Sequence, residues 1–141
     1  MKILLVQEKD YDRNVYVDHL TEGGHQVDCF LPKESLFEKE GIPFFRYPQE
    51  LANLVRSYDA VMLDRETFRD TDIRHCYCWV NKYIQAIVDS GYQGKVIIES
   101  SCLAYDVLLA ELGSNYNKVE ILRQPFSLKD LDGTLETKVK K

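Results

Sequence analysis

Short runs of consecutive apolar residues alternate along the chain with longer segments in which apolar residues recur at helical spacing. The clearest runs are Ile3–Val6, Ala60–Leu63 and Val96–Ile98. Because each run is continuous, it suits a strand covered on both faces, as in a parallel sheet. Weaker strand candidates are Gln26–Phe30 and Val119–Leu122. The pattern therefore predicts five strands.

The spacing of apolar residues also predicts five helices, over Asp12–Leu20, Gln49–Ser57, Cys76–Ser90, Leu103–Leu112 and Leu128–Val139. Alternating strands and helices indicate an α/β fold with right-handed crossovers and helices on both faces of the sheet. No internal repeat or linker interrupts the alternation. We therefore expect residues 1–141 to form a single domain, with no output domain inside the chain.

Composition narrows the class of protein. Eighteen Lys and Arg stand against 23 Asp and Glu, a formal net charge of −5, which argues against direct binding of nucleic acid. No apolar stretch is long enough to span a membrane, and the amino terminus lacks the apolar core of a secretory signal. We expect a cytoplasmic protein, in which Cys29 and Cys102 act as small hydrophobic residues.

Polar residues follow the predicted strands where each strand ends. Gln7-Glu8 follow the first strand, Asp64 the third, Ser100 the fourth and Gln124 the fifth. In parallel α/β sheets these carboxyl ends meet at one edge, where ligands bind. The sequence therefore predicts one polar pocket built from four segments.

This arrangement resembles the receiver domain of bacterial response regulators, the CheY-like family, over nearly the whole chain. The best-matching stretches are Ile3–Glu8, Tyr58–Asp64, Val96–Ser100 and Gln124–Leu128. The resemblance implies a flavodoxin-like, doubly wound parallel sheet with the strand order 2-1-3-4-5.

The resemblance also implies roles for individual residues. Asp64 is the candidate phosphoacceptor, and Ser100 matches the hydroxyl that switches on activation. Mg²⁺ would be held by Glu8, by Asp64 and by the backbone carbonyl of Glu66, with Gln7 at a weakened ligand position. Gln124 replaces the lysine that usually precedes the Pro-Phe pair.

The two glutamines put the switching chemistry in question. An aspartyl carboxylate accepts a phosphoryl group when Mg²⁺ neutralises the developing charge. Gln7 offers only a neutral amide oxygen to the metal, and Gln124 can donate a hydrogen bond but cannot neutralise charge as lysine does. Lys9 or Arg65 could compensate from neighbouring loops, whereas Arg123 should point to the opposite face of its strand.

Three functions follow from these observations. The first is a pseudo-receiver that transduces signals by presenting its fourth helix, fifth strand and fifth helix to a protein partner, or to a second copy in a homodimer. The second is a response regulator phosphorylated at Asp64 by a histidine kinase, whose only catalysis is self-phosphorylation and dephosphorylation. The third is a small flavodoxin-like enzyme or metal protein, supported only by the acids at the strand ends.

Two further segments have an ordinary structural interpretation and a functional one. His75-Cys76-Tyr77-Cys78 contains zinc-ligand residue types but has no second cluster to complete four ligands, so structural cysteines are favoured. The aromatic segment 41–48 is expected to cover the core, with an exposed partner patch as the alternative.

Overall fold

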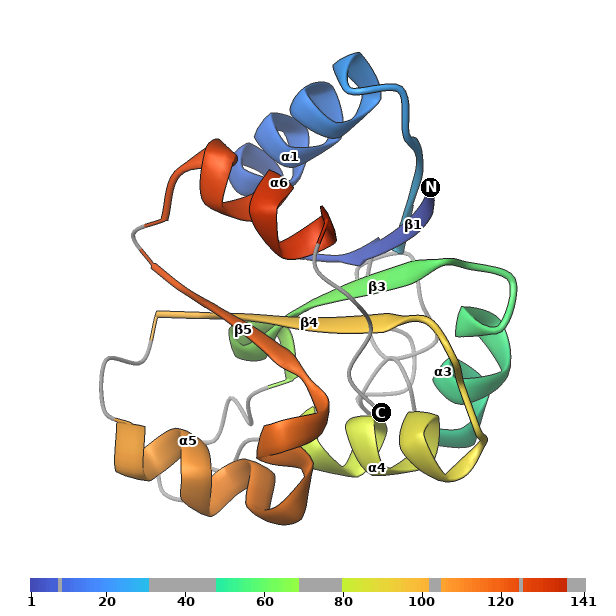
Figure 1. Ribbon diagram of the computed structural model, residues 1–141, viewed down its shortest axis with the longest axis vertical. Helices are drawn as coiled ribbons and strands as arrows, with labels where there is room; N and C mark the ends of the chain where they lie inside the picture. The colour runs from blue at the N-terminus through green and yellow to red at the C-terminus, as the bar shows by residue number, and fades with distance from the viewer. Residues whose placement is uncertain (8, 31–47, 69–79, 102–104, 125, 137–141) are drawn as a thin grey trace.

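The computed structural model describes residues 1–7, 9–30, 48–68, 80–101, 105–124 and 126–136 (Figure 1). The strands are β1 (Lys2–Val6), β2 (Gln26–Phe30), β3 (Ala60–Asp64), β4 (Lys95–Ser100) and β5 (Glu120–Arg123). The α-helices are α1 (Asp10–Glu22), α3 (Pro48–Val55), α4 (Val80–Asp89), α5 (Tyr105–Leu112) and α6 (Leu128–Glu136). Two short 3₁₀ helices are η2 (Arg65–Phe68) and η3 (Gly113–Lys118).

The five strands form one parallel sheet in the order β2-β1-β3-β4-β5, which confirms the predicted α/β fold and its strand order. The continuous apolar runs explain this arrangement, because β1 and β3 bury residues on both of their faces. The pairing of Leu5 with Met62, and of Leu63 with Ile98, places the apolar runs of the central strands side by side.

The predicted elements are present, with bounds that differ in instructive ways. β4 extends the predicted Val96–Ile98 by one residue at its start and two at its end, because the polar residues that flank the apolar run are also buried. The two 3₁₀ helices among the described residues were not predicted from the sequence. Residues 76–79, 103–104 and 137–139 of the predicted helices lie outside the described residues, as do segment 41–47 and the group His75–Cys78.

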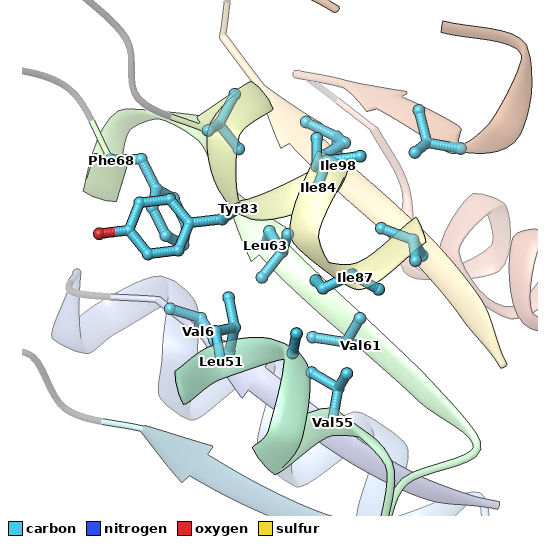
Figure 2. Packing of buried hydrophobic residues seen from close by; sticks show 14 of the residues in the cluster. Val6, Leu51, Val55, Val61, Leu63, Phe68, Tyr83, Ile84, Ile87 and Ile98 are labelled. Carbon is cyan, nitrogen blue, oxygen red and sulfur yellow. The ribbon is translucent and has the colours of Figure 1, made fainter. Parts of the chain in front are cut away.

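Helices cover both faces of the sheet. α1 and α6 lie together on one face, whereas α3, α4 and α5 lie on the other (Figure 1). The core is accordingly divided into two apolar clusters. The α3/α4 side is centred on residues such as Leu63, Ile84 and Ile98, which converge in Figure 2. The α1/α6 side contains Ile97 and Leu131.

The alternation of side chains along each strand determines which residues can meet at the sheet edge. On β4, Ile97 belongs to the α1/α6 cluster and Ile98 to the α3/α4 cluster. Glu99 should therefore share the α1/α6 side with Ile97, whereas the Ser100 side chain falls on the side of Ile98.

Two findings bear on the expectations from composition. Cys29 was expected to behave as a small hydrophobic residue, but it is exposed, because β2 is an edge strand of the sheet. Cys102 lies outside the described residues. In the part of the chain that the structure describes, no helix is both long and apolar enough to cross a membrane.

The space around Gly94 and Gly133 differs, so substitution of each by alanine should change stability in opposite directions. A Cβ at Gly94 would meet the Tyr92 hydroxyl and lie 2.6 Å from the Asp59 carbonyl oxygen, whereas a Cβ at Gly133 in α6 has open space around it. We expect Gly94→Ala to lower the free energy of unfolding by about 1–3 kcal/mol through the steric clash. Gly133→Ala should raise it by about 0.5–1 kcal/mol, because alanine is the better helix former. Urea-induced unfolding measures both, and a Gly94→Ala protein as stable as the parent would contradict the close approach.

Candidate functional site

Four segments of the chain bring polar residues to the carboxyl edge of the sheet. Asp64 is the last residue of β3, and its Cα pairs with that of Glu99 on β4. Gln7 directly follows β1 and Gln124 directly follows β5, where the Gln124 backbone N–H donates to the Ser100 carbonyl at 2.8 Å. The structure thus brings the predicted residues of these four segments to one edge. Glu8 lies outside the described residues.

A buried carboxylate, that of Glu99, occupies the centre of this edge. Glu99 has no exposed surface. Its Oε2 accepts a hydrogen bond from Gln7 Nε2 at 2.9 Å, and its Oε1 accepts from the Tyr16 hydroxyl at 2.8 Å. Gln124 Nε2 also donates to Oε1. We call Gln7, Tyr16, Glu99 and Gln124 the Glu99 cluster; its three donors are neutral.

The elements around the Glu99 cluster hold its donors in place. The Gln7 amide oxygen accepts the backbone N–H of Lys9 at 3.0 Å, so the amide nitrogen is directed toward Glu99. Arg13 Nη1 donates to the Gln7 carbonyl at 3.2 Å and ties this residue to α1. Tyr16, also from α1, stacks on Phe126 with ring centroids 5.8 Å apart. The orientation of each donor is therefore set by contacts beyond the cluster.

Burial dominates the electrostatics of Glu99. Removal from water disfavours the charged form and, with the nearby charge of Asp64, raises the pKa of Glu99 to about 7. The hydrogen bonds from Tyr16 and Gln124 act in the opposite direction, because they stabilise the carboxylate. Burial and the adjacent carboxylate also raise the pKa of the Tyr16 phenol, which stays a donor at neutral pH. The cluster holds its carboxylate through hydrogen bonds from neutral groups.

Asp64, the predicted phosphoacceptor, is also buried, with 2% of its surface exposed. Its Oδ2 accepts a hydrogen bond from the Thr67 hydroxyl at 2.8 Å, and the backbone of Glu66 also hydrogen-bonds to the carboxylate. Burial raises the pKa of Asp64, while these hydrogen bonds and the positive charge of Lys9 oppose the shift. Lys9 thus supplies part of the expected compensating charge.

Ser100 and Glu66 lie near the predicted pocket. Their roles as switch hydroxyl and metal ligand stay predictions. Ser100 is fully buried at the end of β4, and strand alternation places its side chain on the face opposite to that of Glu99. The Glu66 side chain accepts hydrogen bonds from Arg65 Nη1 at 2.9 Å and from the Ser101 hydroxyl at 3.1 Å. The Arg65 guanidinium pairs with Glu66 and with Glu111 of α5, so its positive charge is directed to these two carboxylates.

Some of the oxygens that would hold Mg²⁺ take part in hydrogen bonds within the protein. Mg²⁺ requires several oxygen ligands in an octahedron. The Gln7 amide oxygen already accepts the N–H of Lys9, and one oxygen of Asp64 accepts the Thr67 hydroxyl. Within the described part of the chain, no three His, Cys, Asp or Glu side chains are arranged to hold a metal. Glu8 lies outside the described residues, so the Mg²⁺ site stays a prediction.

Glu99 is the functional candidate that sequence reasoning missed. A glutamate near the end of an apolar strand reads as the first solvated residue of the following loop. Two features of the sequence, taken together, could have identified it. Strand alternation places Glu99 on the face of Ile97, and glutamines replace the expected acid and lysine at the ends of two other strands. An acid that faces two amides at one sheet edge predicts a buried hydrogen-bonded group.

Comparison with known proteins finds similarity at the level of structure. No family model matches the chain, and no curated protein matches it in sequence. Similar solved structures include a two-component response regulator from Clostridium difficile, with 15% identity and a TM-score of 0.64, covering 96% of this chain and 93% of that one. A response regulator receiver protein from Sinorhizobium medicae has 15% identity and a TM-score of 0.62, covering 96% and 90%.

A third similar structure is the chemotaxis protein CheY4 from Vibrio cholerae, with 14% identity and a TM-score of 0.58. The match covers 96% of this chain and 95% of that one. Similarity of this extent, together with the strand order β2-β1-β3-β4-β5, establishes that the chain has the fold of a response-regulator receiver domain.

Proposed function

We propose that this protein is a pseudo-receiver: a signal-transduction module that acts by binding a protein partner and does not require phosphorylation of Asp64. The observation that carries the proposal is the Glu99 cluster. In this proposal Asp64 has no catalytic role, and the domain works through its surface.

The two departures from the family pattern support the proposal because they act on the same group. Gln7 stands where the resemblance implies an acid, and Gln124 where it implies a lysine, yet both side chains donate to Glu99. An acid at position 7 would repel Glu99, and a lysine at position 124 would pair with it. In the proposed function, the amides of Gln7 and Gln124 satisfy Glu99 by hydrogen bonds, in place of the metal and the lysine of the family pattern.

The setting of Asp64 supports the same conclusion. Attack on a phosphoryl donor requires an accessible carboxylate and positive charge around the transferred group. Asp64 is almost completely buried, and Glu99 lies within its electrostatic reach. A phosphoryl group on Asp64 would add negative charge beside a buried carboxylate, which is unfavourable.

The proposed binding surface comprises α5, β5 and α6, which are the fourth helix, fifth strand and fifth helix of the receiver pattern. Val107 and Leu109 on α5 are among its exposed residues, with 42% and 43% of their surfaces accessible. Because they lie two residues apart on the helix, they project from different sides of it. A second copy of the chain is one partner proposed for this surface.

Phosphodonor treatment tests the proposal directly. We expect no gain of a phosphoryl group and no change in the NMR spectrum when the folded protein is incubated with acetyl phosphate, or with beryllofluoride, at millimolar Mg²⁺. The reason is that the Glu99 cluster replaces the metal and lysine on which aspartyl phosphorylation depends. Intact mass and amide chemical shifts are the measurements.

A matched variant makes the negative result informative. Gln7→Asp, Glu99→Val and Gln124→Lys together remove the central carboxylate and restore the acid and lysine that the resemblance implies. Detectable phosphorylation of this variant, and not of the parent, would assign the loss to the three residues. Stoichiometric modification of the parent at Asp64 would contradict the proposal and establish a phosphoaccepting regulator.

The raised pKa of Glu99 predicts a distinctive dependence of stability on pH. The folded protein retains the Glu99 proton up to about pH 7, whereas the unfolded chain releases it near the ordinary value of 4.5. Stability from this group is therefore greatest at low pH and decreases as the pH rises from 4.5 through 7. We expect its contribution to the unfolding free energy to fall by roughly 1–3 kcal/mol over that window.

The comparison with Glu99→Gln isolates this contribution, since the variant cannot ionise at that position. Urea unfolding between pH 5 and 8 should give a flatter profile for the variant than for the parent, whatever its absolute stability. Profiles of equal slope would show that Glu99 is ionised throughout, and that the cluster holds an ordinary carboxylate.

Site-specific cross-linking tests the proposed surface. A photoreactive amino acid at Leu109, on α5, is expected to capture a protein partner in cells, because this position belongs to the proposed surface. The control is the same substitution at Tyr11, which is 79% exposed but lies on α1. Cross-links of the chain to itself from position 109 would identify a homodimer, and equal capture from both positions would contradict a specific surface.

A further inference from the structure

An ion-pair cluster joins the turn after Asp64 to the helix that carries the exposed apolar residues. Arg65 Nε donates to Glu111 Oε2 at 2.7 Å, and Arg65 Nη2 donates to Glu111 Oε1. The guanidinium therefore binds the α5 carboxylate through two parallel hydrogen bonds. Its Nη1 donates to Glu66 at 2.9 Å, which completes a three-residue cluster of Arg65, Glu66 and Glu111.

The buried side chains of the described part of α5 lie along a single line of the helix. Of residues 106–112, only Leu108 and Leu112 are buried, whereas Val107 and Leu109 are exposed. Within residues 106–112, these two leucines are four residues apart and attach one side of the helix to the protein. The bidentate bond from Arg65 supplies an anchor of a different kind, in the last turn of the helix.

The cluster also contacts the residue that follows β4. Ser101, directly after β4, donates its hydroxyl to Glu66 at 3.1 Å. Glu66 is thus attached to the start of the β4–α5 connection, and Arg65 to the far end of α5. Both attachments originate in η2, the turn that begins at the residue after Asp64. The same turn therefore fixes the two ends of the segment that presents the apolar residues.

Burial makes this arrangement stronger than a surface ion pair. The Arg65 side chain is only 9% exposed, and those of Glu66 and Glu111 are 19% exposed. Exposed pairs contribute little, because water screens them, whereas a partly buried bidentate pair is screened less and is costly to break. The Arg65 guanidinium also offsets the negative charge of Glu111 in the last turn of α5, where the helix dipole disfavours an anion.

We propose that Arg65 is a positioning residue whose ion pair with Glu111 latches α5, and that opening of this latch changes the orientation of the helix and of its exposed side chains. The latch sets the orientation of the helix without requiring any modification of Asp64. The role of α5 in partner binding rests on the proposed function; the latch itself is a property of the free domain.

Hydrogen exchange of the full chain tests the latch without a partner or phosphodonor. In Glu111→Gln we expect the α5 amides to exchange about tenfold faster, while the amides of β3, β4 and α4 change by less than about twofold, because opening is local. Glu136→Gln is the matched control, since it removes an exposed carboxylate from the last turn of α6. It should leave α5 exchange unchanged.

Two more variants separate a latch from a general loss of stability. Arg65→Lys keeps the charge but loses the two parallel hydrogen bonds, so it should accelerate the same α5 amides by a smaller factor. It also provides the test if Glu111→Gln fails to fold. In the double variant Arg65→Gln and Glu111→Gln, α5 exchange should remain fast, because no ion pair can form.

Three results would overturn the proposal. Unchanged α5 exchange in Glu111→Gln would mean that the leucines alone fix the helix. Uniform acceleration across the domain would mean that the ion pair contributes only to global stability. Slow exchange restored in the double variant would assign the single-variant effect to an unpaired buried arginine. None of these results bears on phosphorylation of Asp64, so the latch and the proposed function fail independently.

Discussion

The carboxyl edge of this sheet is organised by the need to satisfy one buried carboxylate. Glu99 has no contact with water, and a buried charge without hydrogen bonds costs several kcal/mol. Gln7 and Gln124 arrive from the ends of β1 and β5, and Tyr16 from α1, to meet that need. Because Glu99 is distant in the sequence from both Gln7 and Tyr16, the network also connects β4 to β1 and to the helix that covers this face of the sheet.

Much of the fold could be predicted from the sequence because its strands are simple. The run Ile3–Val6 and the run Ala60–Leu63 are apolar without interruption, and only a strand covered on both faces explains such short segments well. What the pattern could not give was the length of β4. The Lys95 amine donates to the Thr134 carbonyl of α6, and Glu99 bonds to Tyr16, so polar residues are buried by partners distant in sequence.

The position of the candidate site could be predicted from the sequence, but the side chains that interact there were harder to predict. Strand ends meet at one edge in any parallel sheet, so Gln7, Asp64 and Gln124 could be brought together from chain order alone. The identity of their partners depends on which way each side chain points. Glu99 and Ser100 are neighbours in the sequence, yet strand alternation places their side chains on opposite faces of the sheet. Only Glu99 therefore lies on the face where the two glutamines donate hydrogen bonds.

The charge at this edge bears on the proposal that this receiver fold acts without phosphorylation of Asp64. Replacing one acid and one lysine by Gln7 and Gln124 leaves the formal charge unchanged, but Glu99 adds a second acid beside Asp64. Both carboxyls have raised pKa values, and in both burial is the largest cause. A site with two buried acids favours protons and hydrogen-bond donors over a further anion. The edge is thus a closed polar network, and under the proposed function the protein acts through the surface that includes α5.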